Sequence, residues 1–409
     1  MPTHRYATDN PRVRSIARWL TLATVLLILY GSLFPFRFSS LRGVDLWTLI
    51  TGLGFARTSR GDVVANLLLY VPLGLCLMLA WPARWTRFKG FLGAVVVGTL
   101  LSLFVELLQV HASSRVSSLT DLVLNAAGTA IGAIAAIVYL AMGSTIRIPG
   151  AAAGRPDPVP AGLIALWLAF RLAPFVPTID WQKYKDALKP LLFEPDLAWF
   201  DVLRYMVGWL VVGYAVRQVW RREYAVYALV ALAALVLAGR VVVVGKTLTA
   251  SEVVALVACI PLAALLVVLP DRRRALLLAA MLAVVVVITG LKPFTLTSQP
   301  HNFSWVPFMS SLNDNLEVNY SVLLEKCFWY FALIWLLARR GTNVALAAFL
   351  VAALLALIEF AQVWIPGRSA EITDPLLALV GGVLLAILGA HGAPTTRIRT
   401  MTGSYVSRR

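Results

Sequence analysis

Long apolar runs, separated by short polar clusters, constrain this chain more than any other feature of its sequence. Several runs exceed the roughly 18 residues that mark a membrane-spanning helix. Apolar residues make up 60% of the 409 positions and charged residues only 14%, well below the roughly 25% found in soluble domains. A soluble fold of this size would lack a polar shell. The sequence therefore predicts an all-α, polytopic transmembrane helical bundle.

The runs predict about twelve spans in a multi-pass protein of the inner cell membrane. An even number of spans places both termini on one side, and every short loop on that side is basic. Because Lys and Arg accumulate on the cytoplasmic side of membrane spans, both termini are expected in the cytoplasm. The predicted spans cover residues 17–36, 62–82, 89–110, 118–142, 160–177, 200–220, 223–244, 250–270, 274–291, 320–338, 342–365 and 370–391.

The net charge of +16 has the same explanation. In a soluble protein such a charge would suggest nucleic acid, but here the basic residues fit the charge asymmetry of membrane loops. The three cysteines, Cys76, Cys259 and Cys327, lie inside predicted spans and show no metal-ligand spacing. The sequence contains no nucleotide-binding loop, zincin helix or nucleophile elbow. We therefore expect no nucleic-acid partner, no metal, no cofactor and no catalytic residues.

An internal repeat organises the polar residues of the spans. Residues 105–128 align without a gap with residues 358–381, and polar positions coincide although such residues are rare in spans. The alignment places Glu106 on Glu359, Gln109 on Gln362, Arg115 on Arg368, Asp121 on Asp374, Gly128 on Gly381 and Asn125 on Ala378.

A degenerate third copy lies between these two. Lys246 and Glu252 keep the spacing of the basic and acidic positions, whereas Leu237 replaces the glutamate. An X-Pro-Phe sequence ends the first span of each copy, at residues 34–36, 173–175 and 292–294. Each copy has four spans, so the three repeats are expected to be parallel. Their boundaries are predicted at 1–150, 151–272 and 273–395, followed by a basic cytoplasmic tail at 396–409.

The motifs of repeat one resemble those of the VanZ-like family. LYGSLFPF closes the first span, and N-x-x-x-Y-V-P-L-G, from Asn66 to Gly74, lies in the second. E-x-x-Q, an arginine and D-x-x-x-N-x-x-G follow at Glu106, Arg115 and Asp121. The resemblance implies a cell-envelope membrane protein, because the best-known member is associated with resistance to teicoplanin, and it brings no established catalytic mechanism.

The polar residues of repeats one and three are expected at the outer membrane boundary. Residues three or four apart share a helix face, and the third and fourth spans are antiparallel neighbours. The natural ion pair joins Arg115 to Asp121 or Glu106. Gly128 and Gly132 form a small-xxx-small step that lets another helix approach. Two interpretations stay open, a polar clamp between spans and a site for a head group, sugar or peptide. Both use Glu106, Gln109, Arg115, Asp121, Asn125, Glu359, Gln362, Arg368 and Asp374.

Repeat two predicts a different chemistry. Four basic residues, Arg171, Arg204, Arg240 and Lys246, fall near the outer ends of their spans. Arginine matches phosphate and carboxylate with its planar fork, so together they form a possible anion pocket. The alternative is pairing with acids such as Glu252, or snorkelling to lipid head groups.

These observations favour a non-enzymatic envelope protein that binds or shields a lipid, sugar or glycopeptide-type ligand at the outer leaflet. Its partners would be the lipid bilayer and an anionic or polyprenyl-linked lipid, while its oligomeric state stays open. Two other classes compete with this hypothesis. A transporter would place its charges at the bilayer midplane, and an enzyme acting on a polyprenyl-linked substrate would use Glu106 or Glu359 as acid or base.

Overall fold

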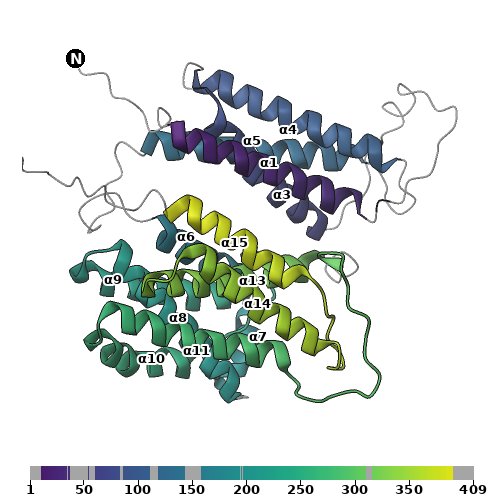
Figure 1. The fold of residues 1–409 in the computed structure, drawn as a ribbon. Coiled ribbons are helices and arrows are strands. Elements are labelled where there is room, and N and C mark those ends of the chain that lie inside the picture. Colours follow the sequence, from purple (N-terminus) through teal and green to yellow (C-terminus); the bar gives the residue numbers. More distant parts are fainter. Residues whose placement is uncertain are drawn as a thin grey trace, which may run out of the picture. The chain divides into compact units, whose positions relative to one another are not determined.

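The computed structural model describes residues 11–34, 36, 54, 60–82, 86–110, 118–142, 158–193, 195, 197–309 and 316–389. Within these ranges every regular element is a helix, and the remaining pairing is confined to isolated bridge residues such as Pro177 and Val243. The all-α prediction is confirmed (Figure 1). The helices are α1 (Pro11–Leu33), α3 (Arg60–Ala80), α4 (Arg87–Gln109), α5 (Leu119–Met142), α6 (Pro158–Leu172), α7 (Trp181–Leu192), α8 (Trp199–Val219), α9 (Arg222–Val242), α10 (Ala250–Val268), α11 (Asp271–Leu291), α13 (Leu316–Arg340), α14 (Val344–Gln362) and α15 (Thr373–Gly389).

Eight helices of the described part are long and apolar enough to cross a membrane, namely α4, α5, α8, α9, α10, α11, α13 and α14. The chain is therefore a multi-pass membrane protein by the length and composition of its helices. Shorter apolar helices occupy the other four predicted spans, at residues 17–33, 69–80, 158–172 and 373–388. The number of twelve spans stays a prediction.

Helix α7 was not among the predicted elements. It lies in the aromatic stretch between the fifth and sixth predicted spans, begins after Asp180, whose carboxylate accepts a hydrogen bond from the Gln182 amide, and ends near Phe193. Its sequence alternates lysines with apolar residues, and Trp181 and Phe193 at its two ends are exposed. Such a helix suits the membrane–water interface.

The chain divides into two compact units, residues 1–149 with 304–323, and residues 150–303 with 324–409. In the first compact unit, α3 packs closely on α5. A Cβ atom at Gly132 would lie 2.0 Å from the carbonyl oxygen of Val71, and one at Gly128 would lie 2.4 Å from that of Leu67. The expected close approach at Gly128 and Gly132 is confirmed, because only glycine leaves room for a neighbouring backbone at this distance.

The X-Pro-Phe sequences share one local structure. Phe36, Phe175 and Phe294 all have positive φ angles, of 59°, 61° and 65°. In each, the phenylalanine amide donates a hydrogen bond to the carbonyl of a leucine three residues earlier, over 2.8 to 2.9 Å. A positive φ is uncommon for a residue with a side chain. The same unusual turn therefore ends α1, α6 and α11.

In the second compact unit, α8 and α13 meet through residue pairs that share one separation along the sequence. Arg204 contacts Glu325, and Gln218 accepts a hydrogen bond from Arg339 over 3.1 Å, both across a separation of 121 residues. The rings of Tyr214 and Trp335, at the same separation, have centroids 5.3 Å apart. In the pair of Arg204 and Glu325 the two side chains carry opposite charges, so they form an ion pair.

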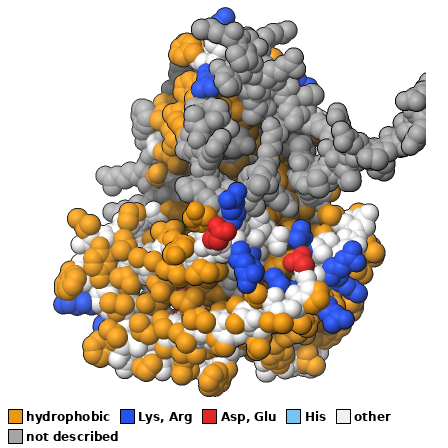
Figure 2. All heavy atoms as spheres, turned by 90° about the vertical axis from the view of Figure 1, so that its left-hand side faces the viewer, with side chains coloured by type: hydrophobic (Ala, Val, Ile, Leu, Met, Phe, Trp, Pro, Cys, Tyr) orange, Lys and Arg blue, Asp and Glu red, His pale blue; other side chains and the backbone are white. Residues whose placement is uncertain are grey.

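The surface of the second compact unit is largely apolar. Figure 2 shows one end of its helices, where orange hydrophobic side chains surround groups of blue basic ones. Arg222 and Arg272, at the starts of α9 and α11, are exposed. The opposite end of the same helices carries the buried polar residues.

Candidate functional site

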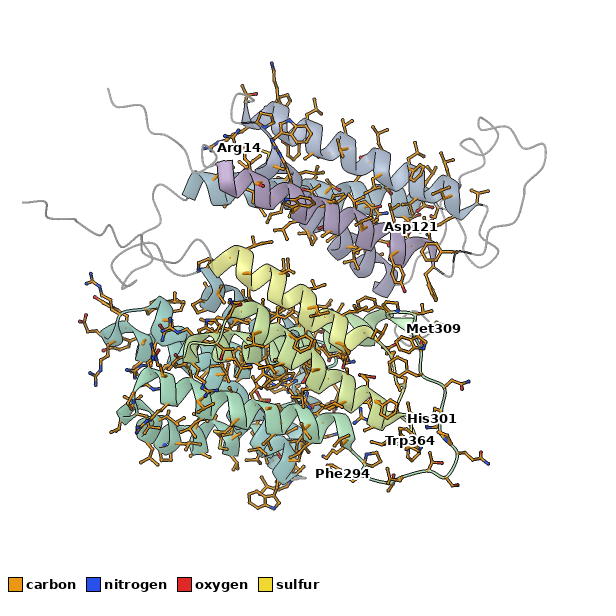
Figure 3. The ribbon with its side chains drawn as sticks, viewed as in Figure 1. Arg14, Asp121, Phe294, His301, Met309 and Trp364 are labelled. Atoms are coloured by element: carbon orange, nitrogen blue, oxygen red, sulfur yellow. The ribbon has the colours of Figure 1, made fainter. Side chains whose placement is uncertain are left out.

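The buried polar side chains of the second compact unit gather where α6, α9 and α14 end and where α8, α10 and α15 begin. Figure 3 labels Phe294, His301 and Trp364 at this end, and the Thr297 amide donates to the carbonyl of Trp364 over 2.8 Å. In the first compact unit, Asp121 lies at the end opposite Arg14 (Figure 3). Both units therefore concentrate polar groups at one end of their bundle.

Glu252 is the centre of the strongest ion-pair network. Its side chain is 0% exposed and contacts the Arg171 guanidinium, while Arg240 Nε donates to its second oxygen over 3.0 Å. Arg171 is also buried, with its guanidinium 4.8 Å from the centre of the Tyr205 ring. No described residue accepts a hydrogen bond from Arg171 Nε. A buried guanidinium with an unused donor is a candidate for binding an anion.

Arg204 extends this network towards α13. It contacts Glu325, whose carboxylate also accepts a hydrogen bond from Trp329 Nε1 over 2.9 Å. Arg240 donates to the Tyr205 hydroxyl over 3.2 Å, and this bond joins the ion pairs of Glu252 to α8, which carries Arg204. A small pocket is lined by Arg171, Arg204 and Tyr205 and by Trp167, Trp209 and Trp329. It has room for about one water molecule.

Lys246 lies in the short loop between α9 and α10, next to these arginines. Burial, reinforced by the positive charges of Arg240 and Arg171, lowers its pKa to about 8. No described residue forms an ion pair with it. Lys183 of α7 donates to the carbonyl of Lys246 over 2.6 Å and to that of Val241 over 3.2 Å, so α7 holds this loop in place.

The paired glutamates of repeats one and three have a structural role. Glu106 accepts a hydrogen bond from the Ser118 amide over 2.9 Å, and Glu359 accepts one from the Glu371 amide over 2.8 Å, twelve residues later in both cases. Each glutamate is almost fully buried and holds the chain just before the next helix. This contact satisfies a buried amide. It therefore explains why each repeat has a glutamate besides its aspartate, without requiring a ligand.

The aspartates that follow these loops take their partners from another helix. Asn66 of α3 donates to Asp121 over 2.7 Å. In α13, Lys326 and the Tyr330 hydroxyl donate to Asp374 over 2.7 and 2.6 Å. The glutamines also bind alike, since Gln109 donates to the carbonyl of Ser32 over 2.8 Å. Gln362 donates to the carbonyl of Gly290 over 3.0 Å.

The predicted ion pair of Arg115 with Asp121 or Glu106 stays a prediction, whereas the bases at the matching positions of the other two repeats, Arg368 and Lys246, do not pair with the acid that follows them. Arg368 donates to the carbonyls of Thr289 and Lys292 over 2.6 and 2.8 Å, so it caps the end of α11 and does not pair with Asp374. Glu252 pairs with two arginines and not with Lys246. Arg115 lies outside the described residues. Both acids take their bases from helices instead, Glu252 from the ends of α6 and α9 and Asp374 from α13.

Asn125 completes the polar interior of the first compact unit. Its side-chain amide donates to Ser102 over 2.9 Å, and both residues are buried. Sequence reasoning missed Glu325, Lys326 and Tyr205 as members of the polar clusters. The signal was present for two of them, because adjacent charged residues inside an apolar run are rare and mark functional positions.

The comparison with known families decides the identity of the chain. The family model described as VanZ/LLP1 matches residues 8–140 and 275–390, which together make up more than half of the sequence. The chain belongs to the VanZ/LLP1 family. The two matched regions of this VanZ/LLP1 protein confirm tandem VanZ-like units, whereas residues 151–272 lie outside both. No curated protein and no solved structure matches the chain.

The polar sites of this VanZ/LLP1 protein are of two kinds, which differ in their partners and in their charge balance. The sites at Glu106 and Glu359 use their polar groups on one another and on the backbone. The cluster around Arg171 and Arg240 instead contains more bases than acids. Among the described residues no group of three His, Cys, Asp or Glu side chains is placed to hold a metal ion. The basic cluster is therefore the better candidate for a binding site.

Proposed function

We propose that this VanZ/LLP1 protein is a non-enzymatic protein of the cell envelope that binds the anionic group of an envelope lipid. The site is the arginine cluster, defined as Arg171, Arg204, Arg240 and Lys246. The ligand reaches it from the outer leaflet of the inner membrane. Twelve spans in three parallel four-helix repeats, with both termini in the cytoplasm, complete the proposal.

The observation that carries the proposal is the basic excess at one end of the helices. Four cations from α6, α8, α9 and the α9–α10 loop surround two carboxylates, Glu252 and Glu325. Uncompensated positive charge near hydrocarbon is costly and is retained where it has a use. Arginine suits phosphate and carboxylate groups because it offers several donors in a fixed plane.

The three-repeat arrangement is supported by the shared X-Pro-Phe turns. The outer location is supported by basic residues at the opposite end, where Arg221 and Arg222 are exposed. Basic residues mark the cytoplasmic side. The expected topology can be tested by labelling single cysteines from either side. Accessibility of residue 246 from the cytoplasm alone would contradict it.

Native mass spectrometry of the purified full-length protein tests the binding. We expect a co-purified anionic lipid, and we expect Lys246→Gln to reduce its occupancy about tenfold. Lys246 is the informative position because the described residues give it no ion pair, so its loss leaves no carboxylate unpaired. Arg222→Gln is the matched control, since it removes one positive charge at the opposite end of α9. Equal lipid occupancy in the wild type and Lys246→Gln would contradict the proposal.

A further inference from the structure

The charge balance of the arginine cluster limits what it can bind. Its four cations face two anions, Glu252 and Glu325, which leaves two positive charges in excess (four minus two). Two further charges of each sign lie around the cluster. Lys183 donates to the carbonyl of Lys246, and Asp186 acts on Lys183. Asp201 acts on Arg204, and Lys292 lies 4.0 Å from the centre of the Phe200 ring. A ligand that balances the site therefore carries two negative charges, or three where it displaces one of these carboxylates.

The two carboxylates of the cluster are held very differently. Glu252 is fully buried and contacts two arginines. Glu325 has a side chain that is 22% exposed, contacts only Arg204 among the arginines, and accepts one further hydrogen bond from Trp329. Releasing a partly exposed carboxylate costs much less than releasing a buried one. Glu325 is thus the group that an incoming anion can replace.

The pocket next to Arg204 is too small for an anion unless a side chain moves. Trp167, Trp209 and Trp329 line it, and it has room for about one water molecule. A Cβ atom at Gly208 would lie 3.2 Å from the Trp329 ring, so this wall is already in close contact. An anion larger than water enters only if a side chain that lines the pocket moves, and Arg204, which contacts Glu325, is one of these.

We infer that the arginine cluster takes a terminal phosphate, as in a phosphomonoester or diphosphate, and that Glu325 occupies Arg204 until this ligand displaces it. The inference rests on the proposed function. A terminal phosphate carries close to two negative charges at neutral pH, since its second pKa is about 6. A phosphodiester or a carboxylate carries one charge, so it would leave the cluster unbalanced. Glu325 then makes the site selective, because an anion that binds Arg204 more weakly than Glu325 does cannot displace it.

The test uses the full-length protein with defined lipids in native mass spectrometry. Phosphatidic acid is the phosphomonoester probe and phosphatidylglycerol is the phosphodiester probe. We expect the wild type to bind phosphatidic acid about tenfold more tightly. Glu325→Gln should raise the affinity for phosphatidic acid about fivefold or more, because the competitor is gone. Glu223→Gln is the control, as it removes one negative charge at the far end of α9.

The outcomes separate the inference from the proposed function. If the wild type binds neither lipid nor inorganic phosphate, the proposed function fails. Equal binding of both lipids, unchanged in Glu325→Gln, overturns the inference alone. Glu325→Asp serves if Glu325→Gln unfolds, because it keeps the charge but shortens the reach to Arg204, and it should also tighten binding. Inorganic phosphate that displaces phosphatidic acid completely would support the phosphate class and identify the free ion as ligand.

Discussion

The sites at the starts of α10 and α15 have the same framework and opposite charge balance. Each begins with an acid in the first turn, Glu252 or Asp374, and each acid binds cationic side chains from neighbouring helices. At α15 the preceding helix also supplies Glu359, which holds a backbone amide. At α10 the corresponding position is Leu237, and Arg240 follows it.

This difference shows how one scaffold gives a structural clamp in one place and a candidate binding site in another. Around α15, the bases satisfy carboxylates or backbone carbonyls, as Lys326 and Arg368 do. Around α10, loss of the glutamate and gain of arginines leave cations in excess. A site whose groups are all satisfied has little to offer a ligand, whereas an unbalanced site gains by binding one.

Neutralising the central acid of each site should give the largest contrast. Glu252→Gln leaves the buried Arg171 and the largely buried Arg240 without their shared carboxylate, so we expect the free energy of unfolding to fall by about 3–5 kcal/mol. Asp374→Asn should cost about 1–2 kcal/mol, because the Lys326 side chain is 35% exposed and water replaces part of the interaction. Thermal unfolding of the purified variants measures both. Equal losses would mean that the two networks contribute alike.

Converting one site into the other is the next test. Leu237→Glu restores the glutamate of repeats one and three at α9, where it can reach the Thr249 amide as Glu106 reaches that of Ser118. The added negative charge should reduce the basic excess and lower anion affinity about tenfold. Leu237→Gln is the matched control, since it has the same size and no charge. Anion binding that survives Leu237→Glu unchanged would break the link between charge excess and binding.

A smaller effect is expected from the hydroxyl that completes the α15 site. Tyr330 donates to Asp374 over 2.6 Å, and Tyr330→Phe removes this bond while keeping the ring. Stability should fall by about 1 kcal/mol, and anion binding should not change. A loss of anion binding in this variant would show that the α15 site is part of the binding site.

Much of the fold follows from the apolar runs. The predicted span at 200–220 coincides with α8 (Trp199–Val219), because both ends are marked by polar or aromatic residues. Helix α7 was missed because it is short and too polar for a span, and its amphipathic pattern was the available signal. The repeat also predicted the shared X-Pro-Phe turns, although not their positive φ angles, which depend on three-dimensional packing.

The members of the polar sites were easier to predict than their partners. The repeat identified Glu106, Glu359 and Asp374, because polar residues are rare in spans. It could not show that Arg368 caps α11, because the competing acceptors are backbone carbonyls, which every residue carries. It also missed the contact between Arg204 and Glu325, since this joins different repeats. Pairing across helices depends on packing that a sequence pattern does not contain.

The last contrast concerns pH, because only the α10 site contains a base with a strongly lowered pKa. Burial and neighbouring arginines lower the pKa of Lys246 from 10.5 to about 8. Lys246 is charged below that pH, so anion affinity should fall a few-fold between pH 7.5 and about 9. Folding stability should change in the opposite direction. The unfolded chain binds more protons than the folded one between about 8 and 10.5, so stability rises with pH in that window. Lys246→Arg, which stays charged, should bind equally at all these pH values, and a fall as steep as in the wild type would assign the titration to another group.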